Sequence, residues 1–413
     1  MSAIASNQVR PTMSSTPVSP QAARFSTNSL FFVCGLLFAT WGVHVPTVKA
    51  LYALSDAGLS WLMLSAGVGA LLGLSQVGQM VARYGTRPVI WATGIGMCIS
   101  LAVLLFAPGY PALLAVLFVY GLCNGSFDVA MNAEAVAVEH AYRRPIMSSF
   151  HGFFSLGGFA GALAGSMTAA MGIAPWLHLA GSAVGGFVVI AVASRWMLPP
   201  EATHSPEEAG RTWSLPKGII LLIGVMGALG MVGEGAMYDW STLYMRDELH
   251  STQQIAALGY GAFSVAMALA RFGGDWVRAR LGSSEALRLS AWVAAAAMTL
   301  TLVLGLHWTT LLGFAVVGLG FANVVPVLFS AAARVPGVTP AKGIAGVSAV
   351  GYVGFMMGPP VIGAIAHRFS LSSALFIVAL FAMAVALLTR RAMAQVGEEP
   401  GAEAVGLPQM SQD

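Results

Sequence analysis

The chain has 413 residues, of which 57% are apolar and 9% are charged, with a formal net charge of +3. A soluble domain carries charge on roughly a quarter of its residues, so this composition excludes a water-soluble fold and makes lipid the solvent for most of the surface. The 20 Lys and Arg residues are scattered between apolar runs. That pattern excludes a basic nucleic-acid-binding stripe.

Twelve apolar segments follow one another along the chain, and each approaches or exceeds the roughly 20 residues that a membrane helix needs. The polar, Ser/Pro/Thr-rich stretch 1–27 before them is predicted to be a disordered tail, and 391–413 a second tail. The spans are expected near 28–47, 59–81, 88–107, 111–138, 146–171, 175–197, 217–245, 253–273, 284–306, 309–333, 342–366 and 371–389.

The distribution of basic residues predicts the orientation. With twelve spans, 17 of the 20 Lys and Arg residues lie on the side that carries both termini, and only Lys49, Arg246 and Arg368 lie on the other. Because Lys and Arg accumulate in cytoplasmic loops, both termini are expected in the cytoplasm.

The longest polar interruption, 198–216, falls between the sixth and seventh spans. It predicts a cytoplasmic linker between two six-helix bundles, 28–197 and 217–390. The two halves also share a sequence feature. A Gly/Arg-rich loop follows the second span, and a similar loop, from Gly274-Asp275 to Arg278, follows the eighth. Repeated halves with a site at their interface are a common transporter plan.

The loop after the second span carries a family resemblance. Gly78, Arg83, Gly85 and Arg87 match a loop motif of the major facilitator superfamily, whereas Ala82 stands where that motif usually has Asp. The resemblance implies an all-α, twelve-helix transporter in which these residues, with Asp275 and Arg278 of the second copy, form gating loops. The departure at Ala82 leaves open any charge latch at that position.

Five further phrases carry a second resemblance: Trp41-Gly-Val-His44-Val-Pro46, Phe127-Asp128-Val-Ala-Met-Asn132, Ser149-Phe-His151-Gly-Phe-Phe-Ser155-Leu-Gly157-Gly158, Glu234-Gly235 with Asp239-Trp240-Ser241, and Asn323-Val-Val-Pro326. Together they are similar to the bacterial MosC-like group, which includes the YbjJ-type inner-membrane proteins. This resemblance implies a multi-pass protein of the bacterial inner membrane, and the group is associated with an inositol-derived amine.

Ionisable side chains inside a bilayer are costly and therefore mark candidate functional positions. Asp128 and Asn132 lie four residues apart on one face of the fourth span, and His151 enters the fifth span from the same side. One interpretation is a proton-coupling Asp128 beside substrate-binding Asn132 and His151. The alternative is a buried network that ties the two spans together.

Glu234 lies past the midpoint of the seventh span, one helical turn from Tyr238. The flanking Gly233 and Gly235 leave room for a helix, water or ligand. We predict that Glu234 carries protons and that Tyr238 contacts substrate, whereas Asp239 lies nearer the outer mouth.

Four further polar or aromatic residues complete the predicted substrate site: Trp41 and His44 on the first span, Asn323 on the tenth and Tyr352 on the eleventh. An indole ring suits the face of a sugar-like ring. However, aromatic belts at membrane interfaces also recruit Trp, and the other three residues could be simple packing or vestibule residues.

The predicted function is secondary active, proton-coupled import of a small polar solute such as a sugar, polyol or inositol derivative, by a monomer of symporter type. The chain contains no Walker loop, nucleophile elbow or metal-ligand cluster, so we expect no enzyme activity, cofactor or metal. Three cysteines inside apolar runs are expected to pack helices. A proton-driven exporter of metabolites or drugs and a non-transporting membrane sensor remain alternatives.

Overall fold

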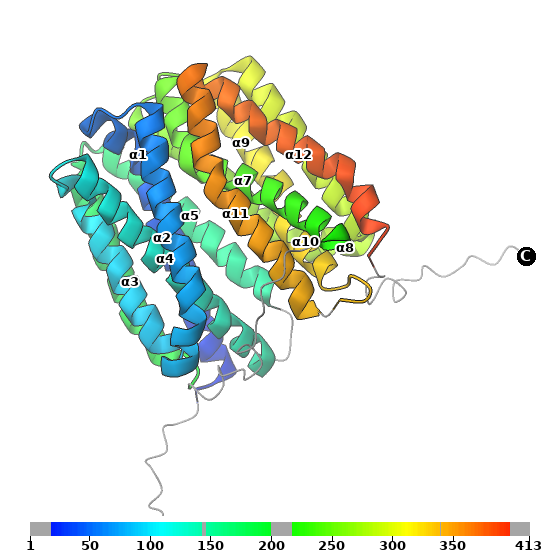
Figure 1. The fold of residues 1–413 in the computed structure, drawn as a ribbon. Helices are drawn as coiled ribbons and strands as arrows, with labels where there is room; N and C mark the ends of the chain where they lie inside the picture. Colours follow the sequence, from blue (N-terminus) through cyan, green and yellow to red (C-terminus); the bar gives the residue numbers. More distant parts are fainter. Residues whose placement is uncertain (1–17, 143–145, 200–216, 339, 397–413) are drawn as a thin grey trace, which may run out of the picture.

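The structure, a computed structural model, describes residues 18–142, 146–199, 217–338 and 340–396. Over these ranges it contains twelve helical segments that are long and apolar enough to cross a membrane, which confirms the predicted all-α membrane fold (Figure 1). The elements are α1 (Pro20–Leu51), α2 (Asp56–Tyr84), α3 (Thr86–Val103), η1 (Leu104–Phe106), α4 (Tyr110–Tyr142), α5 (Met147–Ala170), α6 (Pro175–Ala193), η2 (Ser194–Trp196), α7 (Gly218–Asp247), α8 (Gln253–Leu304), α9 (His307–Phe321), α10 (Val324–Ala332), α11 (Pro340–Arg368) and α12 (Leu371–Met393).

The first helix begins earlier than predicted, which corrects the end of the tail expected over 1–27. Ser19 caps α1 by accepting a hydrogen bond from the Ala22 amide at 3.2 Å, and Pro20 occupies the first turn, where its missing N–H costs nothing. Ser26 donates to the Ala193 carbonyl at 2.7 Å. The hydroxyl-rich composition that suggested disorder therefore supplies a cap and an interhelical bond. Residues 1–17, 200–216 and 397–413, where the rest of the predicted tails and linker fall, lie outside the described residues.

In the second half of the chain, the structure differs from the prediction at the boundary between the eighth and ninth spans and within the tenth span. The eighth and ninth spans form the single element α8, broken at Gly282, where φ is 74° and ψ is 155°. The tenth span is divided into α9 and α10, with Asn323 at the junction. Pro359 and Pro360 both lie within α11, which remains helical through them.

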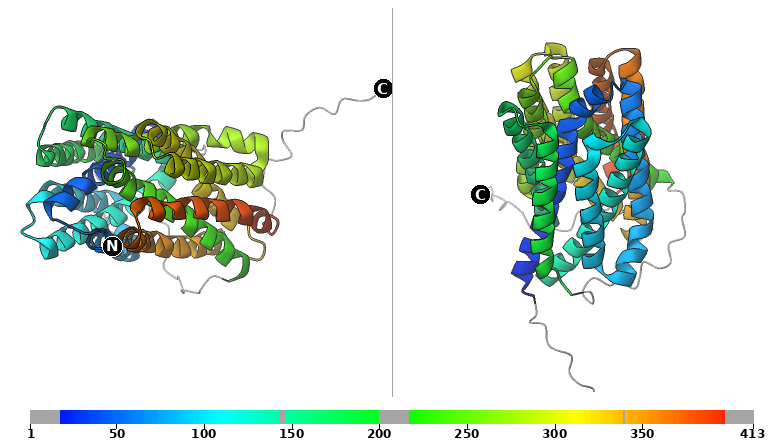
Figure 2. Two further views of the ribbon diagram at one scale, coloured as in Figure 1. Left: turned by 90° about the horizontal axis from the view of Figure 1, so that it is seen from above. Right: turned by 90° about the vertical axis from the view of Figure 1, so that its left-hand side faces the viewer.

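The helices form two bundles, α1–α6 and α7–α12, that pack side by side (Figures 1 and 2). In the first bundle α1 packs on α5 and α2 on α4, and in the second α7 packs on α11. Contacts between the bundles run mainly from α5 to α8, from α2 to α11 and from α1 to α7. We call the end of the bundle that carries Pro20 and Met393 the terminal face, and the end that carries Lys49 and Leu371 the opposite face.

Glycines permit the closest helix contacts within the first bundle. A Cβ atom on Gly157 of α5 would overlap the Phe32 carbonyl oxygen of α1, and one on Gly35 would overlap the Phe154 carbonyl oxygen. This reciprocal pair brings the two backbones together, as small residues do in membrane helix packing. The two helices can approach this closely in only one register. The contact therefore fixes where the neighbouring side chains of α5 lie along α1.

Replacing Gly157 with Leu is therefore expected to destabilise the bundle by about 1–3 kcal/mol, because α1 and α5 must separate. The matched control is Gly181→Leu on α6, where no described atom lies within 4 Å of the added Cβ. The midpoint of thermal unfolding of the purified proteins measures both. Equal midpoints for the two variants would contradict the packing argument.

Candidate functional site

A buried ion pair lies at the boundary between the bundles. Arg271 Nη2 of α8 lies 3.0 Å from Glu234 Oε1 of α7, and the two side chains are 10% and 15% exposed. Tyr238 donates its hydroxyl hydrogen bond to the same carboxylate oxygen at 3.1 Å. Arg271 Nη1 donates to Ser155 Oγ of α5 at 2.9 Å. The guanidinium thus bonds to both bundles, and its charge offsets that of the carboxylate inside the membrane.

Aromatic rings surround this ion pair. The Tyr238 ring lies 5.3 Å from Tyr260, 5.2 Å from Phe263 and, across the bundle boundary, 5.6 Å from Phe38 of α1. Three buried polar atoms nearby have no hydrogen-bond partner in the described part of the chain: Tyr260 Oη, Ser264 Oγ and Arg271 Nε. Buried polar atoms ordinarily bond to something, so these atoms are available to a solute or to water.

Asp128 and Asn132 share one face of α4, as predicted. Asn132 Nδ2 donates to the Asp128 carbonyl at 2.9 Å and to Asp128 Oδ1 at 3.3 Å. Asp128 is also close enough to Tyr352 of α11 for an electrostatic interaction. The predicted site residues Asp128 and Tyr352, from different bundles, therefore lie within electrostatic range of each other.

His151 of α5 contacts the first helix. Its ring packs edge-on against Phe31 of α1, with 5.3 Å between centroids and 78° between planes. It lies within electrostatic range of Arg271. These contacts place His151 near the ion pair, and its predicted role beside Asp128 and Asn132 stays a prediction.

Trp41 and His44 point into the first bundle rather than toward its partner. Trp41 is 4% exposed and lies beside Ser100 of α3 and Tyr120 of α4. His44 Nε2 lies 2.9 Å from His178 Nδ1 of α6. Both residues thus have partners within one bundle, which favours the packing interpretation.

Asn323 lies at the break between α9 and α10 and is 8% exposed. Its side-chain oxygen lies against the backbone of Gly274, where no Cβ could be accommodated. This contact allows α8 to approach the helix break closely. Asn323 therefore packs within the second bundle.

The predicted gating loop after α2 lies at the terminal face. Gly78, Arg83 and Arg87 are exposed, and the Arg83 guanidinium stacks 5.2 Å from the centre of the Tyr84 ring. Gly85 ends α2 with φ of 80°, a value that favours glycine. In the second copy, Arg278 lies in α8, and the side chain of Asp275 falls outside the described residues.

Sequence reasoning missed a buried carboxylate beside this loop. Glu134 of α4 is 0% exposed. It accepts hydrogen bonds from Thr86 Oγ1 and from the Leu198 amide, each at 2.7 Å. Glu134 thereby ties the start of α3 to the chain that leaves the first bundle, next to the position where Ala82 replaces the motif's Asp.

The sequence analysis also placed Arg271 among the residues of the terminal side, and it named Ser155 only within a family phrase, without a role in the site. The available signal was electrostatic, because a charged residue within one span generally pairs with another inside the membrane. Glu234 therefore required a cation, and Arg271 lies within the predicted span 253–273.

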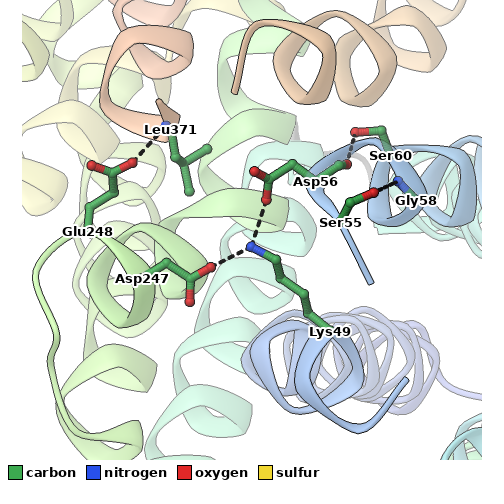
Figure 3. A network of polar contacts seen from close by, with 8 residues as sticks. All are labelled: Lys49, Ser55, Asp56, Gly58, Ser60, Asp247, Glu248 and Leu371. Carbon is green, nitrogen blue, oxygen red and sulfur yellow. Dashed lines mark hydrogen bonds and ion pairs between the residues drawn. The ribbon is translucent and has the colours of Figure 1, made fainter. Parts of the chain in front are cut away.

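A second network joins the bundles at the opposite face (Figure 3). Lys49 Nζ lies 2.7 Å from Asp56 Oδ1 of α2 and 2.5 Å from Asp247 Oδ2 of α7. Gln253 Nε2 of α8 donates to the Val43 carbonyl of α1 at 2.7 Å. Lys49 thus links its own bundle to the other through Asp247.

The helices α2 and α11 approach each other on the same side. A Cβ atom on Gly363 would overlap the Ser60 hydroxyl, and Gly67 lies against Met356. Toward the terminal face α2 and α11 diverge (Figure 1). The structure therefore holds the two bundles together at the opposite face.

The chain is similar to known transporters in sequence. The pattern of the Major Facilitator Superfamily matches residues 29–337. An uncharacterised MFS-type transporter of Yersinia pestis is 34% identical over 366 residues, which cover 88% of this chain and 94% of that protein. The membrane protein MosC of Rhizobium meliloti is 35% identical over 352 residues, which cover 84% of this chain and 85% of MosC.

Solved structures show the same fold. The nucleoside transporter NupG gives a TM-score of 0.62 at 15% identity, covering 90% of this chain and 98% of NupG. A bacterial homologue of the lysosomal transporter Spinster, in an inward-facing and unoccupied conformation, gives 0.66 at 13% identity, covering 94% and 100%. From its sequence pattern, its relatives and its two bundles of membrane helices, this chain is a member of the major facilitator superfamily.

Proposed function

We propose that the protein imports a small polar organic solute, of the sugar, polyol or inositol-derivative kind, in symport with protons by alternating access. The observation that carries this proposal is the contact of Arg271 with Glu234 in its own bundle and with Ser155 in the other. A solute bound there would touch both bundles, so its binding would be coupled to their relative movement.

The chemistry of these residues suits a polyhydroxylated solute. A hydroxyl group both donates and accepts hydrogen bonds, while the carboxylate of Glu234 accepts and the guanidinium of Arg271 donates. The rings of Tyr238 and Tyr260 offer apolar faces for the C–H side of a sugar-like ring. The unpartnered hydroxyls of Tyr260 and Ser264 extend the set of groups available to such a solute.

Protons would act through Asp128 and Glu234. Protonation of Glu234 removes the charge that holds Arg271, which frees the guanidinium to rearrange between Ser155 and the solute. Asp128 lies within electrostatic range of Tyr352 of the other bundle, so the effect of its charge would also change when the bundles move relative to each other. A carboxylate whose surroundings change with conformation can couple proton binding to that change.

The test is solute flux in proteoliposomes, first by counterflow with a panel of polyols, sugars and amino derivatives of inositol. A pH gradient of one unit, acid on the side of the opposite face, supplies about 1.4 kcal/mol and thus roughly tenfold accumulation for one proton per solute. We expect Asp128→Asn to lose this accumulation while solute exchange continues.

Three results would contradict the proposal. Gradient-driven accumulation that survives in both Asp128→Asn and Glu234→Gln would show that neither carboxylate couples to protons. Accumulation driven from the terminal side toward the opposite side would instead identify an exporter. Ligand binding without flux of any tested solute would favour a sensor.

A further inference from the structure

An apolar groove of about 530 Å³ lies on the outside of the second bundle, between the second part of α8 and α12. Its floor is built from small side chains, since Ala295 and Ala379 are each 6% exposed. Leu300 and Leu380, which are 58% and 54% exposed, form part of its walls. The lining residues are Trp292, Ala295, Ala296, Thr299, Leu300, Val303, Phe376, Ala379, Leu380 and Met383.

The groove belongs to the membrane-facing surface. Both of its helices are membrane spans, Arg280–Leu304 and Leu371–Met393. The one hydroxyl in its lining, that of Thr299, donates to the Ala295 carbonyl at 2.8 Å. A groove of this kind suits a hydrocarbon chain. A chain in the groove makes van der Waals contact on several sides, whereas a chain on a flat helix surface makes contact on only one side.

Positive charge gathers at the end of the groove nearest the terminal face. Glu285 Oε2 lies 2.5 Å from Arg288, and Glu285 Oε1 lies 3.7 Å from Arg390. Arg391 follows Arg390 on α12 and is also exposed. Three arginines against one glutamate leave a net positive charge toward the terminal-face ends of the two spans.

The spacing between charge and groove fits a phospholipid. Arg390 follows Met383 by seven residues and Arg288 precedes Trp292 by four, or about 10 Å and 6 Å along the helices. A phosphate on the arginines would thus place an acyl chain of the same molecule in the groove. Anionic lipids are known to occupy basic sites beside membrane helices.

We propose that this groove is a specific binding site for an anionic phospholipid of the leaflet on the terminal side, with one acyl chain in the groove and the phosphate on Arg390, Arg391 and Arg288. A second copy of this chain fits less well. In a two-fold dimer through α8 and α12, both copies of these arginines would lie at the same membrane depth. Their like charges would then oppose association.

The test compares phosphatidylglycerol with phosphatidylcholine of identical acyl chains, each added to the purified protein in detergent. We expect phosphatidylglycerol to raise the thermal midpoint about 2–4 °C more than phosphatidylcholine does. Arg390→Gln with Arg391→Gln should remove this preference. Ala296→Trp should fill the groove and abolish lipid stabilisation, and native mass spectrometry should show the loss of the bound lipid.

The matched control is Ala115→Trp, which places the same ring at an exposed position of α4 outside the groove and should leave the phosphatidylglycerol effect unchanged. Equal stabilisation of the unsubstituted protein by the two lipids would overturn the proposal. So would an unchanged lipid effect in Ala296→Trp. A dimer in detergent that Ala296→Trp converts to a monomer would assign the groove to a second copy instead.

Discussion

Replacing Arg271 with Gln is expected to abolish solute transport and to lower the free energy of unfolding by roughly 3–5 kcal/mol. The reason is that the Glu234 carboxylate, 15% exposed and inside the membrane, would lose the cation that compensates it. Ser155 would also lose its hydrogen bond from the other bundle. Thermal unfolding and counterflow in proteoliposomes measure the two effects separately.

The double variant Arg271→Gln/Glu234→Gln separates charge compensation from transport. Without either charge, two amides can hydrogen-bond to each other and to Tyr238, so most of the lost stability should return. Transport should remain absent, because the proposed proton carrier and solute donor are both missing. Recovery of proton-driven uptake in the double variant would contradict the role of this pair.

A matched control lies on the same helix. Arg288 of α8 pairs with Glu285, but these side chains are 32% and 47% exposed. In detergent without added phospholipid, Arg288→Gln should therefore lower the free energy of unfolding by less than about 1 kcal/mol. If Arg271→Gln were no more destabilising than this variant, the ion pair at the bundle boundary would have no special energetic role.

The second large effect is expected from Lys49→Glu at the opposite face. The substitution turns the attractions to Asp56 and Asp247 into repulsions. In the proposed mechanism it should shift the equilibrium toward opening at that face by about tenfold or more, which corresponds to about 1.4 kcal/mol. Spin labels at Leu51 and Thr252, exposed residues of different bundles, report this opening as a longer distance.

The two acidic partners of Lys49 provide an internal control. Asp247 belongs to the other bundle, whereas Asp56 belongs to the same bundle as Lys49. Asp247→Asn should therefore favour opening, and Asp56→Asn should change the label distance much less. Because these pairs are partly exposed, each should contribute about 0.2–1 kcal/mol. Equal shifts in the two variants would show that the network stabilises a loop and does not join the bundles.

Much of the fold could be predicted because the membrane constrains it strongly. Each span needs about 20 apolar residues, and the polar stretch 198–216 divides the chain into halves. Composition was less reliable at the ends of spans. The Ser- and Thr-rich start of α1 is helical because Ser19 caps the helix and Ser26 bonds to a carbonyl, which composition alone does not reveal.

The candidate site could be predicted only in part. Local spacing placed Asp128 with Asn132 and Glu234 with Tyr238, since residues four apart share a helix face. The partners of those residues are remote in sequence, as Arg271 is from Glu234 and Tyr352 is from Asp128. Helix rotation determines such partners, and rotation follows from packing against all neighbouring helices. For the same reason the sequence left open whether Trp41 and His44 contact substrate or pack, and the structure places both against residues of the first bundle.

The sequence by itself thus determined a membrane protein of twelve spans in two halves, with carboxylates inside the membrane, because hydrophobic length and intrahelical spacing are local properties. Only the tertiary structure decided that Glu234 is paired with Arg271, that Arg271 reaches Ser155, and that Lys49 links the bundles at the opposite face. The contacts of Arg271 with Ser155 and of Lys49 with Asp247 arise where helices from different bundles meet, and that of Glu234 with Arg271 arises where two helices of the second bundle meet. Their geometry depends on close approaches, such as that of Ser60 and Gly363, which no single segment encodes.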